Sequence, residues 1–150
     1  MTKEYSDKTA RQVRNKNNKI FAQFQQSPYF SKMFKYCQKE AKYVVEELGE
    51  FLYDYELIEP EDWTINQFLG QTYNIQRKCM YSKIFFKALP KVIYHFSLFC
   101  EKNNIGSFKK EKIEEFWQDL REGYYEDTFY SSWEEGYQIR QREYKIFFEF

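Results

Sequence analysis

The sequence predicts an all-α protein that folds as a single compact bundle of about six helices. Its 150 residues include only five glycines and three prolines, whereas proteins on average use roughly 12% of the two together. This shortage favours few turns and long elements. Apolar residues over 28–58 recur at spacings of three and four, the period of an amphipathic helix. The composition is globular, with 43% hydrophobic and 31% charged residues.

A chain of this length is about one domain and needs no disulfide or metal to fold. We expect residues 1–26 to form a basic N-terminal arm or helix, and residues 27–150 to form the bundle domain. Ser6 is the expected N-cap of a helix over 6–25. The first half of that segment is nearly all polar, so it is either a solvated helix or a disordered arm.

The second helix is expected over 28–58. Ser27 and Pro28 supply a capping residue and a proline at the first helical position. Pro60 ends the helix, because the residue before a proline disfavours the α region. The apolar pattern of this segment is carried by Phe30, Met33, Phe34, Cys37, Ala41, Val44, Val45, Leu48, Phe51, Leu52 and Tyr55.

Two capping signals place the next helices. Thr64, with Gln67 three residues later, forms a capping box before a short helix over 65–76. Ser82 is the expected N-cap of a helix over 82–103. The density of apolar residues there predicts the most buried helix of the bundle.

Proline and glycine divide the last part of the chain. Pro90 lies inside the fourth helix, where it either kinks the helix or marks its true first turn. Gly106 supplies the positive φ of the following C-cap. Ser107 is expected to cap a fifth helix that Gly123 stops, and a sixth helix is expected over 127–147.

The helices over 28–58 and 82–103 should form the spine of the bundle. Its core should be rich in rings, because the chain holds 16 Phe, 14 Tyr and 3 Trp. The predicted core residues include Phe34, Val45, Leu48, Phe51, Trp63, Phe68, Phe85, Leu89, Ile93, Phe96, Phe116 and Trp117.

Positive and negative charges alternate in blocks, although 23 basic and 23 acidic residues cancel in sum. Residues 1–45 and 76–112 are basic, and residues 46–75 and 113–150 are acidic. One interpretation is that basic and acidic helices pack side by side and screen one another. The other is that a basic block forms a face for phosphate or for an acidic partner.

The large number of aromatic residues is compatible with a binding face made of exposed rings, because tyrosine and other aromatic residues are enriched at interfaces. An AT-rich genome would produce the same surplus. If a binding face exists, the expected partner-binding residues are Tyr124, Tyr125, Phe129 and Tyr130.

Nucleic-acid binding is the first alternative function. Arg11, Arg14 and Asn18 fall on one helical face beside Lys19, and such a segment can track phosphates. A second basic stripe at intervals of four residues consists of Lys83, Lys87 and Lys91. The neutral total charge is below what a dedicated nucleic-acid-binding domain shows.

A Mg²⁺-dependent nucleotide hydrolase is the second alternative. Glu46, Glu47 and Glu50 have the spacing with which one helix turn holds Mg²⁺ in all-α nucleotide pyrophosphatases of the MazG type. Those enzymes need a second carboxylate pair on the following helix. Here Glu59 and Asp62 lie in a loop, so a solvated acidic helix face is the favoured interpretation.

No other pattern indicates catalysis. His95, the only histidine, lies in the most apolar helix without a nucleophile signature, which favours a structural role. Cys37, Cys79 and Cys100 are widely separated and odd in number, which fits a reduced cytosolic compartment. The glycines are isolated and form no phosphate-binding loop. We therefore expect no catalytic residue, no cofactor and no resident metal.

From residue 52 onward the pattern resembles an uncharacterised helical domain found in many bacterial proteins, sometimes beside a SecA C-terminal-type zinc motif. The resemblance covers roughly residues 50–136. Its motifs are Trp63-Thr64, Arg77-Lys78, Leu89-Pro90 and Ser132-Trp133. The chain lacks the cysteine and histidine ligands of the zinc motif, so the resemblance implies a helical fold and no metal.

These observations favour a non-enzymatic, cytoplasmic interaction protein of bacterial or phage origin that binds a protein partner through a charged and aromatic surface. The start of the chain has no apolar signal-peptide core. The longest apolar stretch, over 84–100, is too short and too charged to span a bilayer, so no membrane contact is expected. The partner and the oligomeric state do not follow from the sequence.

Overall fold

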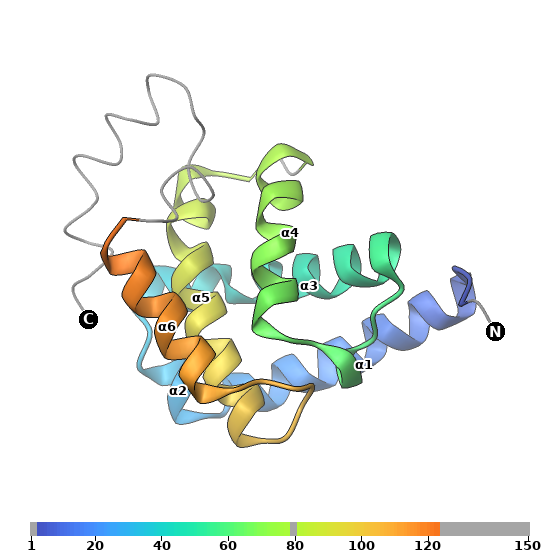
Figure 1. Cartoon of the computed structure of the whole chain (residues 1–150), viewed down its shortest axis with the longest axis horizontal. Coiled ribbons are helices and arrows are strands. Elements are labelled where there is room, and N and C mark those ends of the chain that lie inside the picture. Colours follow the sequence, from blue (N-terminus) through green and yellow to red (C-terminus); the bar gives the residue numbers. More distant parts are fainter. Residues whose placement is uncertain (1–2, 79–80, 124–150) are drawn as a thin grey trace.

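A computed structural model describes residues 3–78 and 81–123, and Figure 1 shows their arrangement. Within these ranges the protein is all-α, with one short 3₁₀ turn and no strand. The helices are α1 (Asp7–Gln25), α2 (Pro28–Ser31), α3 (Lys35–Glu56), α4 (Ile65–Lys78), α5 (Lys83–Lys102) and α6 (Lys110–Arg121), and the 3₁₀ turn is η1 (Pro60–Asp62).

The two longest helices, α3 and α5, form the spine of the bundle, as predicted. They pack against each other more extensively than any other pair of described elements. α1 and α4 lie against α3, and α2 and α6 lie against α5 (Figure 1). None of the helices in the described ranges combines the length and the apolarity that a bilayer crossing requires.

The expected single helix over 28–58 is two helices, so that prediction is corrected. α2 and α3 are separated by a turn at Met33 and Phe34. Gln38 closes the turn, because its side-chain amide donates to the Met33 carbonyl oxygen at 2.9 Å. Apolar residues on both sides of the turn pack on the same core. The apolar spacing of three and four residues therefore continues across the turn, and the sequence contains no sign of an interruption.

α3 ends in a left-handed residue before it reaches the proline. Leu57 has φ 56°, and its N–H donates to the Tyr53 carbonyl oxygen at 2.9 Å. This bond and the positive φ make an αL-type C-cap, and the next N–H, of Ile58, donates to the Leu52 carbonyl oxygen at 3.1 Å. Pro60 instead begins η1.

The predicted caps of four helices are confirmed. Each capping side chain accepts a hydrogen bond from a backbone N–H in the first turn, at 3.0–3.4 Å. The capping residues are Ser6, Ser27, Thr64 and Ser82, and Gln67 completes the capping box by accepting from the Thr64 N–H at 2.8 Å. Pro90 lies in the interior of α5, so it does not mark the first turn.

Ser107 does not cap α6, which corrects another prediction. α6 begins after Lys109, whose side chain makes no capping hydrogen bond. The Ser107 N–H instead donates to the Trp63 carbonyl oxygen at 2.7 Å. The left-handed residue of the α5 C-cap is Asn104, with φ 57°, and not Gly106 as predicted. Gly106 also has a positive φ, 68°, but it lies in the loop, where a Cβ would be 2.5 Å from the same Trp63 oxygen. The loop before α6 is therefore pinned to Trp63. The sixth predicted helix, over 127–147, lies outside the described residues.

Phe96 on α5 is the centre of a cluster of rings. Its centroid lies 5.1 Å from Phe24, 5.9 Å from both Trp63 and Phe68, and 6.2 Å from Phe99. Such ring pairs contribute about 0.5–1.5 kcal/mol each beyond their burial. Because the rings come from α1, α4, α5 and the loop after η1, the cluster ties these elements together.

Most of the predicted core residues are buried, but three lie at the edge of the core. Each of the three packs against the ring of a tyrosine in a stacked arrangement. The pairs are Phe34–Tyr36, Phe51–Tyr55 and Trp117–Tyr94, with ring centroids 4.5–5.9 Å apart.

α1 is a packed helix and not a disordered arm, because Val13, Asn17 and Phe24 are buried. It approaches α3 at Gly49, where a Cβ would lie 2.3 Å from Asn17 Nδ2. That Nδ2 donates to the Val45 carbonyl oxygen at 3.1 Å. A side chain at residue 49 would displace this bond, so the close contact between the helices depends on glycine.

We expect Gly49→Ala to lower the free energy of unfolding by about 1–3 kcal/mol, the usual cost of overpacking. In an Asn17→Ala background the same substitution should cost less, because the clashing amide is gone. Urea unfolding followed by circular dichroism measures all four members of this cycle. Equal costs of Gly49→Ala in the two backgrounds would contradict the account.

Candidate functional site

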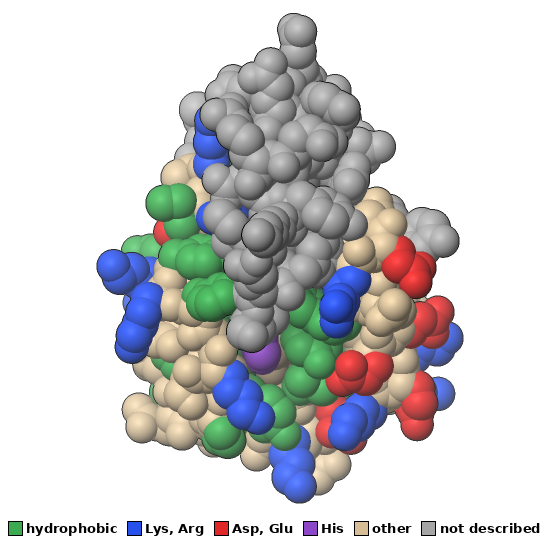
Figure 2. Space-filling view, turned by 90° about the vertical axis from the view of Figure 1, so that its left-hand side faces the viewer, with side chains coloured by type: hydrophobic (Ala, Val, Ile, Leu, Met, Phe, Trp, Pro, Cys, Tyr) green, Lys and Arg blue, Asp and Glu red, His purple; other side chains and the backbone are tan. Residues whose placement is uncertain are grey.

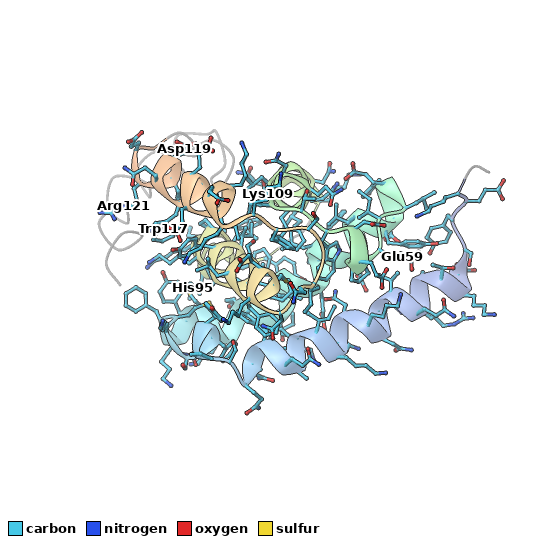
Figure 3. The ribbon with its side chains drawn as sticks, turned by 60° about the horizontal axis from the view of Figure 1, so that its bottom comes forward. Glu59, His95, Lys109, Trp117, Asp119 and Arg121 are labelled. Carbon is cyan, nitrogen blue, oxygen red and sulfur yellow. The ribbon has the colours of Figure 1, made fainter. Side chains whose placement is uncertain are left out.

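The basic block of α1 lies against the acidic block that begins on α3. Arg14 Nε lies 3.0 Å from Glu50 Oε1, and Lys16 Nζ lies 2.7 Å from Glu61 Oε1 and 3.5 Å from Glu59 Oε1. Figure 3 shows Glu59 beside α1. The hydrogen bond from Lys16 lowers the pKa of Glu61. In this part of the protein, oppositely charged elements do screen one another.

The residues of the two predicted basic stripes do not form one surface. Lys87 Nζ lies 4.9 Å from the ring centroid of Tyr36, near the start of α3. Arg14 contacts Glu50, about 21 Å further along α3 at about 1.5 Å per residue. Lys91 is buried, with Nζ 4.6 Å from the Phe34 ring. The remaining members are Arg11, Asn18, Lys19 and Lys83, all exposed.

The three carboxylates of the proposed metal set contact three different groups. Glu46 lies 3.9 Å from Lys42 Nζ, Glu47 accepts from the Tyr81 hydroxyl at 2.7 Å, and Glu50 pairs with Arg14. Across the described ranges, no cluster of three or more histidine, cysteine or acidic side chains is close enough to hold a metal. The acidic face is thus engaged in ordinary surface contacts.

His95 lies in an apolar setting on α5. Figure 2 shows apolar side chains gathered around the single histidine, with basic side chains nearby, and Figure 3 places it on the same side of the molecule as Trp117. Burial, together with the charges of Lys32 and Lys91, lowers the pKa of His95 to about 4. A neutral, buried imidazole of this kind fits the predicted structural role.

The predicted partner-binding residues, Tyr124, Tyr125, Phe129 and Tyr130, lie outside the described residues. The described surface has other exposed apolar residues, of which Tyr43, Tyr55 and Ile84 are 46–52% exposed. Two of them belong to a row on α3 at intervals of four residues, Tyr43, Glu47, Phe51 and Tyr55. We call this row the tyrosine ridge.

The tyrosine ridge is held in place by neighbouring side chains. Tyr81 lies 6.1 Å from Tyr43, ring centroid to ring centroid, and its hydroxyl donates to Glu47. At the other end, Phe51 stacks on Tyr55 at 5.4 Å, and Lys78 Nζ donates to the Tyr55 hydroxyl at 2.6 Å. The exposed rings therefore have defined positions before any partner binds.

A groove of about 480 Å³ begins at the end of the tyrosine ridge, where the last turn of α3 meets the outer face of α4. Four of its lining residues carry side-chain amides, and the others supply one hydroxyl, one carboxylate, one ammonium and one glycine. The lining residues are Tyr55, Glu56, Asn66, Gln67, Gly70, Gln71, Asn74 and Lys78. We call this feature the amide groove.

Hydrogen bonds orient two of the amides in the groove. Gln71 Nε2 donates to Glu56 Oε2, and Asn74 Nδ2 donates to Gln71 Oε1 at 3.0 Å. Asn66, in contrast, is exposed and makes no side-chain hydrogen bond to the described part of the chain. The groove thus combines a fixed wall with an amide that is available to a ligand.

Sequence reasoning missed the amide groove. A signal was present, because Asn66, Gly70 and Asn74 recur at intervals of four residues and so share one face of the predicted helix over 65–76. Only the structure shows that this face borders the end of α3, because the contact depends on the turn at Leu57 and on the crossing of α3 by α4.

Comparison with known protein families, with curated proteins and with solved structures finds no match to this chain. The resemblance of residues 50–136 to a bacterial helical domain therefore stays a prediction.

We expect acid to destabilise the protein through His95. Its pKa is about 4 when folded and 6.5 when unfolded, so the unfolded chain binds more protons between these values. The free energy of unfolding should therefore fall by up to about 3 kcal/mol as the pH falls from 6.5 to 4. In His95→Gln this part of the pH dependence should vanish, as chemical denaturation at several pH values will show. Parallel pH profiles for the two proteins would contradict the prediction.

Proposed function

We propose that this chain is a non-enzymatic, cytosolic interaction protein of bacterial or phage origin that binds a protein partner through the tyrosine ridge and the adjoining amide groove. The single observation that carries the proposal is the pair of half-exposed rings, Tyr43 and Tyr55, whose positions are fixed by neighbouring side chains. Fixed rings lose little conformational freedom on binding, and tyrosine is enriched among the residues that dominate protein interfaces.

The charge of this region favours a protein partner over a nucleic acid. Residues 46–62 of α3 and η1 carry eight acidic and no basic side chains, which repels phosphate. On the facing helix, Arg14 and Lys16 are already paired with carboxylates of this acidic stretch. Two of the basic side chains of α1 are therefore already engaged in ion pairs and are less available to bind a phosphate backbone.

Substitution of the ridge tyrosines should weaken partner capture. We expect Tyr55→Ala and Tyr43→Ala each to weaken binding by tenfold or more, because truncation of a central interface tyrosine costs about 2 kcal/mol. Tyr5→Ala is the matched control, since Tyr5 is 51% exposed and lies against Tyr53, on the opposite side of α3 from Tyr55. The measurement is quantitative mass spectrometry of proteins retained from native-host lysate by each immobilised variant.

Two results would refute the proposal. One is equal retention of the same proteins by the wild type and the ridge variants. The other is release of the retained material by nuclease, which would favour the nucleic-acid alternative and direct attention to Arg11 and Lys19.

A further inference from the structure

We infer that the amide groove binds an extended segment of the partner polypeptide through its main chain, with Gly70 as the open floor over which that chain passes. The inference rests on the proposed function and deepens it by naming the kind of structure recognised. Three features of the groove support it. Its amides match the hydrogen-bonding groups of a peptide, and Gly70 is not required by packing. The Tyr55 ring is already covered by Phe51 and Lys78.

The amides of the groove match the hydrogen-bonding groups of a polypeptide backbone. A side-chain amide both donates and accepts, as does each peptide unit. Asn66 makes no hydrogen bond to the described chain, and Gln67 uses only its oxygen, to accept from the Thr64 N–H. Gln71 is already oriented by its bond to Glu56, and Asn74 by its bond to Gln71. A phosphodiester offers acceptors only, and would meet the Glu56 carboxylate.

Gly70 has no packing reason to be glycine. It lies inside α4, where glycine costs about 0.5–1 kcal/mol relative to alanine. A Cβ there would meet no atom within 4 Å, in contrast to Gly49, where it would strike Asn17. Gly70 also has ordinary helical φ. Because neither packing nor backbone geometry requires glycine, we assign its role to the space that it leaves in the groove.

The aromatic wall of the groove is poorly suited to stack a nucleobase or a sugar. Phe51 already stacks on the Tyr55 ring, with an interplanar angle of 9°. Lys78 Nζ lies over the same ring, 4.2 Å from its centroid, and donates to its hydroxyl. A ligand therefore meets a ring that is already stacked and covered by a cation, which favours contact with the ring edge by a peptide side chain.

The length of the groove sets the length of the bound segment. Asn66 and Asn74 are eight residues apart on α4, which corresponds to about 12 Å. An extended chain covers this distance with about four residues. Short peptides are therefore sufficient ligands, and no folded partner is needed to test the inference.

The experiment is a selection of random twelve-residue peptides, displayed on phage, against the full-length protein. The enriched peptides are then synthesised, and their affinities for the wild type and the variants are measured by fluorescence anisotropy. Gly70→Gln fills the floor of the groove and should raise helix stability, so a loss of binding would not reflect unfolding. Asn66→Ala combined with Asn74→Ala removes the amides, and Ala22→Gln is the matched control on the exposed face of α1.

We expect the enriched peptides to bind Gly70→Gln and the double variant at least tenfold more weakly than the wild type, and Ala22→Gln with unchanged affinity. Failure to enrich any peptide, or equal affinity for Gly70→Gln, would overturn the inference. Binding of mixed-sequence DNA or RNA twelve-mers that Gly70→Gln abolishes would overturn it in favour of a nucleic-acid site. If the lysate partner is lost by Tyr55→Ala but retained by Gly70→Gln, the inference fails while the proposed function stands.

Discussion

The close contact between α1 and α3 at Gly49 is the constraint on which most of the structure depends. It brings the basic side chains of α1 within reach of the carboxylates of α3 and η1. It also leaves room for Trp63, whose Cζ2 would lie 3.4 Å from a Cβ at residue 49. Trp63 in turn holds the loop before α6 through its carbonyl oxygen and joins the ring cluster around Phe96. The absence of a side chain at Gly49 therefore affects the positions of both α1 and the loop before α6.

The two glycines of neighbouring helices illustrate opposite uses of the same residue. Gly49 is buried and required by a helix contact, whereas Gly70 is exposed and faces open space. α3 connects them, because its inner face packs on α1 and α5 while its outer face carries the tyrosine ridge to the amide groove. The left-handed turn at Leu57 ends the helix directly after Tyr55 and Glu56, so both side chains border α4. The candidate binding surface is therefore a consequence of how α3 ends.

The sequence predicted the fold class, the spine and most caps, because these depend on local chemistry and on apolar period. It did not predict the break at Met33 and Phe34, since the apolar spacing continues through the turn. It assigned a cap to Ser107, because the distant carbonyl of Trp63 that binds this residue cannot be recognised from neighbouring residues. The amide groove was missed for a similar reason: its two walls come from different helices, and only tertiary packing brings Tyr55 beside Lys78.

The central claim is that a partner polypeptide lies in the amide groove, and site-specific photo-crosslinking in native-host cells tests it most directly. A benzophenone amino acid replaces Asn66 in the groove or, as the control, Gln118 on the exposed face of α6. The account predicts one dominant protein adduct from position 66, cross-linked through a short peptide, and none of that adduct from position 118. An adduct with nucleic acid, or the same adduct from both positions, would contradict it.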